Sequence, residues 1–70
     1  MDKTDFTTGR IYQRLIDEKS RTSSKTVEIV HGLDHQVDIN KLCKNLVSLI
    51  PIAEITFRVL PHGYEMKVRI

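Results

Sequence analysis

The stretch "EITFRVLPHGYEMKVR", residues 54–69, carries the clearest structural signal in this chain. Apolar and polar residues alternate on either side of Pro61 and Gly63, which is the pattern of two half-buried strands around a turn. Pro61 cannot adopt the positive φ that the first loop position of a two-residue type I′ or II′ turn requires, so a four-residue loop at 60–63 is predicted. The stretch therefore predicts a β-hairpin.

One register of this hairpin satisfies both faces of the sheet. The apolar pairs are Val59 with Tyr64, Phe57 with Met66 and Ile55 with Val68. The polar pairs are Arg58 with Glu65, Thr56 with Lys67 and Glu54 with Arg69, and two of these join opposite charges. A slip by one residue would turn every side chain to the wrong face, so the register is predicted together with the hairpin.

Two further elements are predicted before the hairpin. The segment "TVEIVHG", residues 26–32, alternates and stops at a glycine, which indicates a strand. From Asp38, a suitable N-cap, to about Ile50, apolar residues recur at the spacing of an amphipathic helix, which Pro51 would end. These apolar residues are Ile39, Leu42, Cys43, Leu46, Leu49 and Ile50.

The order of these elements predicts the fold class. Strand, helix and strand favour a right-handed crossover with the first two strands parallel, and the hairpin adds a third, antiparallel strand. We therefore expect an α+β domain of two layers, β-α-β-β, over residues 26–70, with the helix on the apolar face of the sheet. Phe57 is expected in its core, where Phe57→Ala would cost roughly 3–5 kcal/mol.

Residues 1–25 are predicted to form an N-terminal arm and linker, helical or disordered. Thr7 or Thr8 could N-cap a short helix that carries an apolar cluster of Ile11, Tyr12, Leu15 and Ile16. The run "KSRTSSK", residues 19–25, is polar and without periodicity, as in a linker. The cluster could fold on binding an acidic partner or pack against the body as part of its core, and the linker favours the first.

Length and composition narrow the classes of function. With 11 Lys and Arg against 9 Asp and Glu, the chain lacks the dense positive charge of a dedicated nucleic-acid binder. The single cysteine, Cys43, cannot form an internal disulfide, which indicates a reducing compartment. Because no apolar run suits a membrane span or a signal peptide, a cytoplasmic location without membrane contact is expected. A chain of 70 residues builds only a small core, so a partner or second copy would add stability.

No motif predicts catalysis, a metal or a cofactor. The spacing of His31, His35 and Cys43 matches no zinc pattern. Asp34, His35 and Asp38 lie together in one connection, which could indicate acid–base chemistry, but a solvated connection that caps the helix explains them more simply. The chain is therefore not expected to be an enzyme.

The segments "TVEIVHG", the amphipathic helix and "LIPIAEITFRV" together resemble the front part of the DinI-like family, small damage-response proteins that modulate the RecA recombinase filament. The residues that match its proline-containing junction are Pro51, Ala53, Ile55, Phe57 and Val59. The resemblance implies a β-α-β arrangement and a regulatory role toward a DNA-processing machine. In that family an acidic C-terminal helix carries the partner contact, and residues up to Ile70 hold no counterpart of it, so no binding residue is taken from the resemblance.

Two classes of function remain open. The first is a small regulatory or inhibitory protein, of the kind found in phage or stress responses, that binds a larger protein machine and forms homodimers through an edge strand or the arm. The second is a nucleic-acid-binding module that uses the basic residues of arm and sheet. Acidic residues interrupt the sheet face, and it carries no aromatic residue to stack on a base, which favours the first class. The residues predicted to bind a partner are Arg10, Ile11, Tyr12, Arg14, Leu15, Arg58, Lys67 and Arg69.

Overall fold

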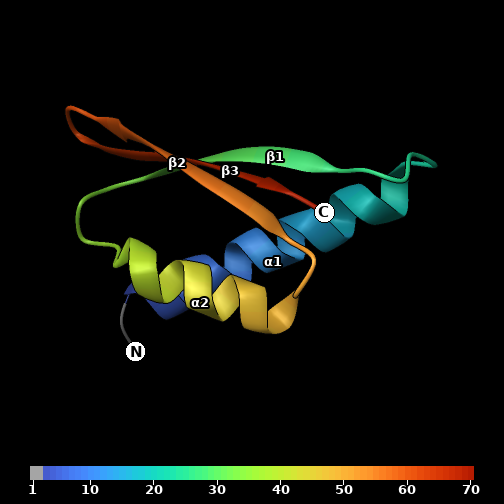
Figure 1. Ribbon diagram of the computed structural model, residues 1–70, viewed down its shortest axis with the longest axis horizontal. Coiled ribbons are helices and arrows are strands. Elements are labelled where there is room, and N and C mark those ends of the chain that lie inside the picture. The colour runs from blue at the N-terminus through green and yellow to red at the C-terminus, as the bar shows by residue number, and fades with distance from the viewer. Residues whose placement is uncertain (1–2) are drawn as a thin grey trace.

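The computed structural model describes residues 3–70 and has the element order α-β-α-β-β. The elements are helix α1 (Lys3–Arg21), strand β1 (Glu28–Leu33), helix α2 (Ile39–Leu49), strand β2 (Glu54–Leu60) and strand β3 (Gly63–Arg69). The sheet forms one layer and both helices lie on the same side of it (Figure 1). The predicted two-layer α+β class is confirmed, with one helix more than the β-α-β-β core.

The hairpin of β2 and β3 has the predicted register, with Phe57 opposite Met66 at its centre. Pairing continues one step beyond the prediction, to Leu60 and Gly63, so the turn consists of residues 61 and 62. Neither turn residue has a positive φ, as expected with a proline at the first position. The hairpin is therefore closed more tightly than the four-residue loop that the sequence suggested.

Strand β3 lies in the middle of the sheet, in the order β1-β3-β2, and is antiparallel to both neighbours. Strands β1 and β2 therefore run in the same direction, as the crossover predicted, but they are not adjacent. Val27 and Ile70 exchange backbone hydrogen bonds of 2.9 Å and so extend the pairing of β1 with β3. Met66 and Val68 of β3 are both 0% exposed, because the central strand has a neighbour on each side. This order makes β1 and β2 the two edges.

Helix α2 begins and ends where the sequence predicts. The side chain of Asp38 accepts a hydrogen bond of 3.1 Å from the backbone N–H of Lys41, which satisfies one of the free donors of the first turn. The helix ends at Leu49, just before Pro51 removes a backbone donor. Leu42 and Leu46 point into the core and are 0% exposed.

Helix α1 is part of the domain and not an arm. Ile11 and Leu15 belong to the same buried cluster as Leu42 and Leu46 of α2. Residues 3–21 thus share the core of residues 26–70, and the predicted division at residue 25 does not describe the packing. No helix within residues 3–70 is long and apolar enough to cross a membrane.

Threonines explain how α1 packs. Thr7 and Thr8, predicted as N-caps, lie inside the helix and are buried, as is Thr4. The Thr8 hydroxyl donates a 2.9 Å hydrogen bond to the carbonyl oxygen of Thr4, so its polar atom is satisfied within the helix. The Thr4 hydroxyl accepts a 3.0 Å hydrogen bond from the backbone N–H of Asp38, which joins α1 to the start of α2. These short side chains extend the stripe of Ile11 toward the start of the helix.

Candidate interaction surfaces

The apolar cluster predicted on α1 divides between core and surface. Ile11 and Leu15 are 0% exposed, so in this structure they cannot contact a partner, and for them the core alternative holds. Three buried threonines, Thr4, Thr7 and Thr8, continue the same side of α1, so this whole side of the helix faces the core. Tyr12 is only partly buried and Ile16 is 41% exposed. Half of the predicted strip therefore remains accessible.

The two predicted cations of α1 lie near the edge of β1. Arg14 donates a 2.9 Å hydrogen bond from Nη1 to the carbonyl oxygen of Val30, and the same atom lies 3.5 Å from Nδ1 of His31. The guanidinium of Arg10 lies 5.6 Å from the centroid of the Phe6 ring. Burial lowers the pKa of His31, and the charges of Arg14 and Arg10 lower it further. Arg14 thus covers part of this edge of the sheet.

The predicted cations of the sheet lie among acidic residues on its outer face. Arg69 is 2.5 Å from Glu54, and Arg58 is 4.0 Å from Glu65. Lys67 lines a hollow on this face together with Glu28, Glu54, Thr56 and Arg69. These exposed pairs contribute little to stability, but they neutralise much of the positive charge that a phosphate backbone would need. The cations of α1 and of the sheet lie in different layers and form no single basic surface.

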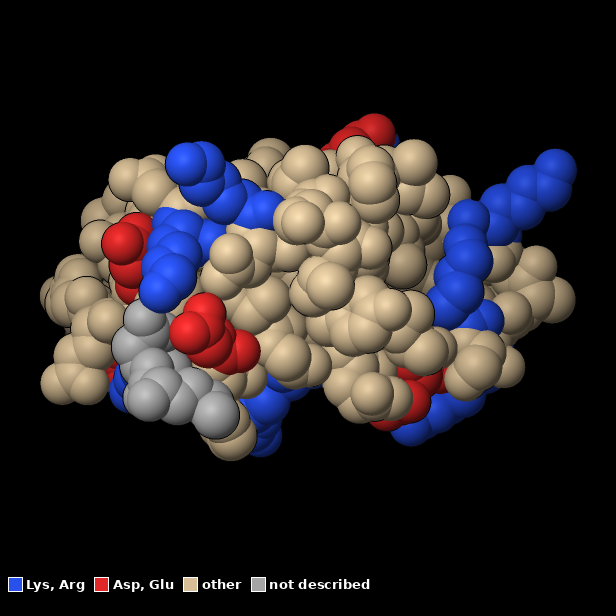
Figure 2. All heavy atoms as spheres, turned by 90° about the horizontal axis from the view of Figure 1, so that it is seen from below, with Lys and Arg blue, Asp and Glu red and all other residues tan. Residues whose placement is uncertain are grey.

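The exposed side of the helix layer is mostly uncharged. Helices α1 and α2 run in the same direction, with Asn45 Nδ2 3.4 Å from Asp5 Oδ1 near the start of α1 (Figure 1). Farther along both helices, Thr8 and Leu49 line one shallow hollow. Figure 2 shows this layer from below, with charged side chains gathered toward its two ends and a broad uncharged area between them.

Four accessible apolar side chains belong to the two helices of this layer and to the turn after α2, and we name them the helix patch: Tyr12, Ile16, Leu49 and Ile52. Tyr12 and Ile16 follow Thr8 at four-residue spacing, so they lie on the same side of α1. Leu49 is 52% exposed and Ile52 is 76% exposed. Thr8 and Leu49 line one hollow, and the two helices run in the same direction. One turn farther along α1, Tyr12 therefore lies toward the residues that follow α2. A patch in which large apolar side chains are exposed together is typical of an interaction site.

Only part of this patch could be recognised in the sequence. The periodicity assigned Leu49 to the apolar stripe that faces the sheet, whereas the structure leaves this side chain half-exposed beside α1. Ile52 follows Pro51 in a turn, where no periodicity predicts which way a side chain points. The two halves come from helices that pack against each other and run in the same direction. The sequence analysis treated residues 1–25 as a separate arm and did not predict this packing.

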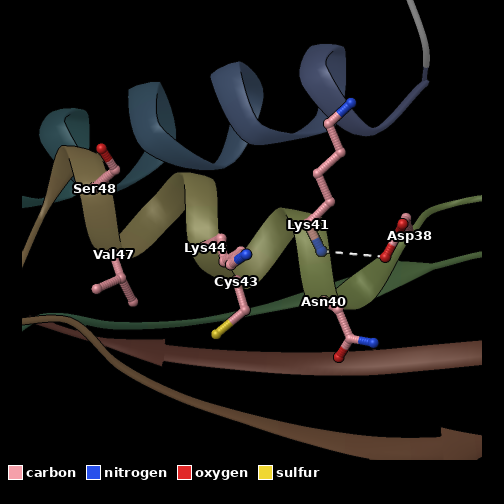
Figure 3. Close-up of a pocket in the computed structure, with 7 residues that line it drawn as sticks. All are labelled: Asp38, Asn40, Lys41, Cys43, Lys44, Val47 and Ser48. Carbon is pink, nitrogen blue, oxygen red and sulfur yellow. Dashed lines mark hydrogen bonds between the residues drawn. The ribbon is translucent and has the colours of Figure 1, made fainter.

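A second apolar surface follows the edge strand β2. Val59 is 75% exposed, and Phe57 is only partly buried although the register turns it toward the helices. In Figure 3, the side chains of Cys43 and Val47 point away from α1, on the side of α2 where the strand ribbons run. Both line a shallow hollow along α2, and Val47 is 40% exposed. Helix α2 therefore leaves the β2 side of the sheet incompletely covered.

The connection between β1 and α2 is explained by its structural contacts. Asp34 accepts a hydrogen bond from the ammonium group of Lys3, which lowers the pKa of the carboxyl. The ring of His35 meets that of Tyr64 edge-on at 5.4 Å, and Asp38 caps α2. Within residues 3–70 no group of three or more His, Cys, Asp or Glu side chains could hold a metal ion.

Comparison with known proteins assigns no family. No family model matches the chain, and neither the curated proteins nor the solved structures gave a match. The resemblance to the DinI-like family therefore stays a prediction, and a function has to be proposed from the surfaces.

Proposed function

We propose that this chain is a small, non-enzymatic regulatory or inhibitory protein that binds a larger protein machine through the helix patch. The observation that carries the proposal is the exposure of three large apolar side chains in the helix layer, Ile16, Leu49 and Ile52. In so small a chain, large apolar side chains left outside the core add surface that a protein partner can bury. A machine that processes DNA is one candidate, which the resemblance to the DinI-like family suggests.

The charges around the helix patch indicate the chemistry of the partner. Lys19 and Arg21 lie in the last turn of α1, and Lys41 lies in the first turn of α2. Lys41 lies 3.9 Å from Asp5 and Arg21 lies 3.7 Å from Glu18, so both signs of charge border the patch. Such a border fits a partner whose own apolar site is edged by charges of complementary sign. The bordering charges would raise the rate of association, while the buried apolar side chains would set its lifetime.

Nucleic-acid binding is the less favoured alternative. Its cations would have to act together, yet Arg58 and Arg69 are paired with acidic residues and lie in a different layer from Arg10 and Arg14. A phosphate-binding surface would show itself as a steep loss of affinity with rising salt concentration.

Site-specific photo-crosslinking tests the proposal. A photoreactive residue placed at Ile52 should crosslink the full chain to a distinct protein in extracts of the source cells, while the same residue at Val30, exposed on the outer sheet face of β1, should not. Excess unlabelled chain should compete for this crosslink, and an Ile16→Ser/Leu49→Ser chain should not. Both substituted side chains are exposed, so circular dichroism should show an unchanged fold.

Two results would contradict the proposal. One is equal crosslinking of the distinct protein from positions 52 and 30, or crosslinking only to further copies of this chain. The other is binding to DNA or RNA that weakens steeply with salt and is lost in an Arg58→Ala/Arg69→Ala chain, which would establish the alternative.

A further inference from the structure

Strand β2 is an open edge of the sheet. Its seven residues form pairs with β3 on one side only. No side chain within residues 3–70 hydrogen-bonds to its backbone, in contrast to β1, where Arg14 binds the carbonyl oxygen of Val30. It also contains no proline, one of the features that keep edge strands from pairing with other chains. A second strand can therefore add to β2.

We propose that this strand is β2 of a second copy of the same chain, related by a two-fold axis that passes Thr56. The pairing would join the two sheets into one antiparallel sheet of six strands, three from each copy. Such a contact is self-complementary, because each copy presents the same strand to the other.

The charges of β2 identify the occupant and fix its register. With the axis at Thr56, Glu54 of each copy lies opposite Arg58 of the other. An axis at Glu54 or at Arg58 would set like charges opposite each other, which is destabilising. An axis at Ile55 or Phe57 would leave both charges opposite uncharged residues. The Thr56 register is thus the one, among axes at these five residues, in which the strand complements itself.

The intramolecular ion pairs extend this pattern across the contact. Within each copy, Arg58 lies 4.0 Å from Glu65, and Arg69 lies 2.5 Å from Glu54. Pairing of β2 with its copy creates a row of Glu65 and Arg58 from one chain followed by Glu54 and Arg69 from the other. Charge alternates along the whole row, and the two-fold axis generates the row twice.

The opposite side of the new sheet would cover apolar surface. In this register Phe57 lies opposite Ile55 of the second copy, and Val59, now 75% exposed, lies opposite Ala53. The axis also sets the second helix layer beside the side of α2 that faces away from α1, where Cys43 and Val47 point in Figure 3. Burial of these side chains would enlarge a core that is small for a free-standing domain.

A charge-reversal experiment tests the register on the full chain. Sedimentation equilibrium should show a dimer for the native chain and dissociation constants at least about tenfold higher for Glu54→Lys and for Arg58→Glu, since each reversal places like charges opposite each other twice. An equimolar mixture of the two variants should dimerise again, because the lysine introduced in one chain then faces the glutamate introduced in the other. The control Glu28→Lys, on β1 of the same sheet face, should dimerise like the native chain.

A crosslink gives an independent measure of the axis. In a Cys43→Ser background, Thr56→Cys should form a disulfide-linked dimer on mild oxidation, because residue 56 faces itself across the axis. Val30→Cys, at an exposed position on β1, is the matched control and should crosslink far less. The proposal is overturned if the native chain stays monomeric at high concentration, if either reversal leaves dimerisation unchanged, if the mixture stays monomeric, or if positions 56 and 30 crosslink equally. Ile16 and Leu49, whose substitution tests the partner proposed above, lie on α1 and at the end of α2 and not on β2, so these results test the β2 contact and not that partner.

Discussion

The helices cover the two edge strands of the sheet, β1 and β2, to different extents. Under β1, helix α1 is in place, and Ile29 and Leu33 are 4% and 8% exposed. Along β2, Phe57 is only partly buried and Val59 is 75% exposed. The chain thus has two helices for three strands, and α1 lies on the β1 side. Most of the folding stability should therefore come from the β1 side, while the β2 side keeps apolar surface for association.

Removing α1 should have the largest effect on stability. Deleting residues 1–24 exposes Leu42 and Leu46 and loses the burial of Ile11 and Leu15, each worth about 1.5–3 kcal/mol. That loss is comparable with the whole stability of a domain of this size, so we expect the truncated chain to be unfolded. Circular dichroism and thermal melting measure this. A cooperative melt near that of the full chain would show that α1 is the dispensable arm that the sequence suggested.

Single truncations compare the two sides directly. Leu15→Ala on the β1 side should lower the free energy of unfolding by about 2–5 kcal/mol, because the side chain is 0% exposed and leaves a cavity. Phe57→Ala on the β2 side should cost less, about 1–2 kcal/mol, because part of the ring already contacts water. This value replaces the larger cost expected from the sequence. Urea unfolding of the monomer at low concentration measures both, and a Phe57→Ala cost at or above that of Leu15→Ala would refute the comparison.

Gly63 lies where the end of β1 approaches the hairpin closely. A Cβ at Gly63 would lie 2.0 Å from the carbonyl oxygen of Leu33, a backbone atom that cannot move aside cheaply. Gly63→Ala should therefore lower the free energy of unfolding by roughly 1–3 kcal/mol. At Gly32 a Cβ would meet nothing within 4 Å, so Gly32→Ala is the matched control and should change stability by less than about 0.5 kcal/mol. Equal effects in urea unfolding would contradict the close approach.

Local pairing rules account for the parts of the fold that the sequence predicted. The hairpin register follows from residues that meet within a few positions of one turn, and each apolar or charged pair supports the same alignment. The N-cap at Asp38 and the stop before Pro51 are equally local. The strand order was not predicted, because alternation in β1 specifies which side faces the core and not which strand lies beside it.

The surfaces were harder to predict, for two physical reasons. Thr4 and Thr8 read as polar, although threonines whose hydroxyls are hydrogen-bonded within or between helices pack as small core residues, so the helix stripe of α1 was underestimated. Alternation also says nothing of coverage, and it could not show that α2 leaves Val59 exposed. Sequence reasoning thus could not separate the accessible side chains of the α1 cluster from the buried ones.

The smallest expected effect concerns the pH dependence of the covered edge. His31 on β1 is half-buried beside Arg14, and burial together with the charges of Arg14 and Arg10 lowers its pKa below the ordinary 6.5. The unfolded chain then binds a proton at higher pH than the folded one, so this part of the stability is present above about pH 6.5 and is lost as the pH falls toward the folded-state pKa. Urea unfolding at about pH 7.5 and about pH 5.5 should show that His31→Gln loses less stability on acidification than the native chain. His62→Gln, in the exposed turn, should behave like the native chain. An identical loss in the His31→Gln chain and the native chain would show that the environment of Arg14 and His31 does not keep the imidazole neutral, and that the β1 edge is more open to water than its contacts indicate.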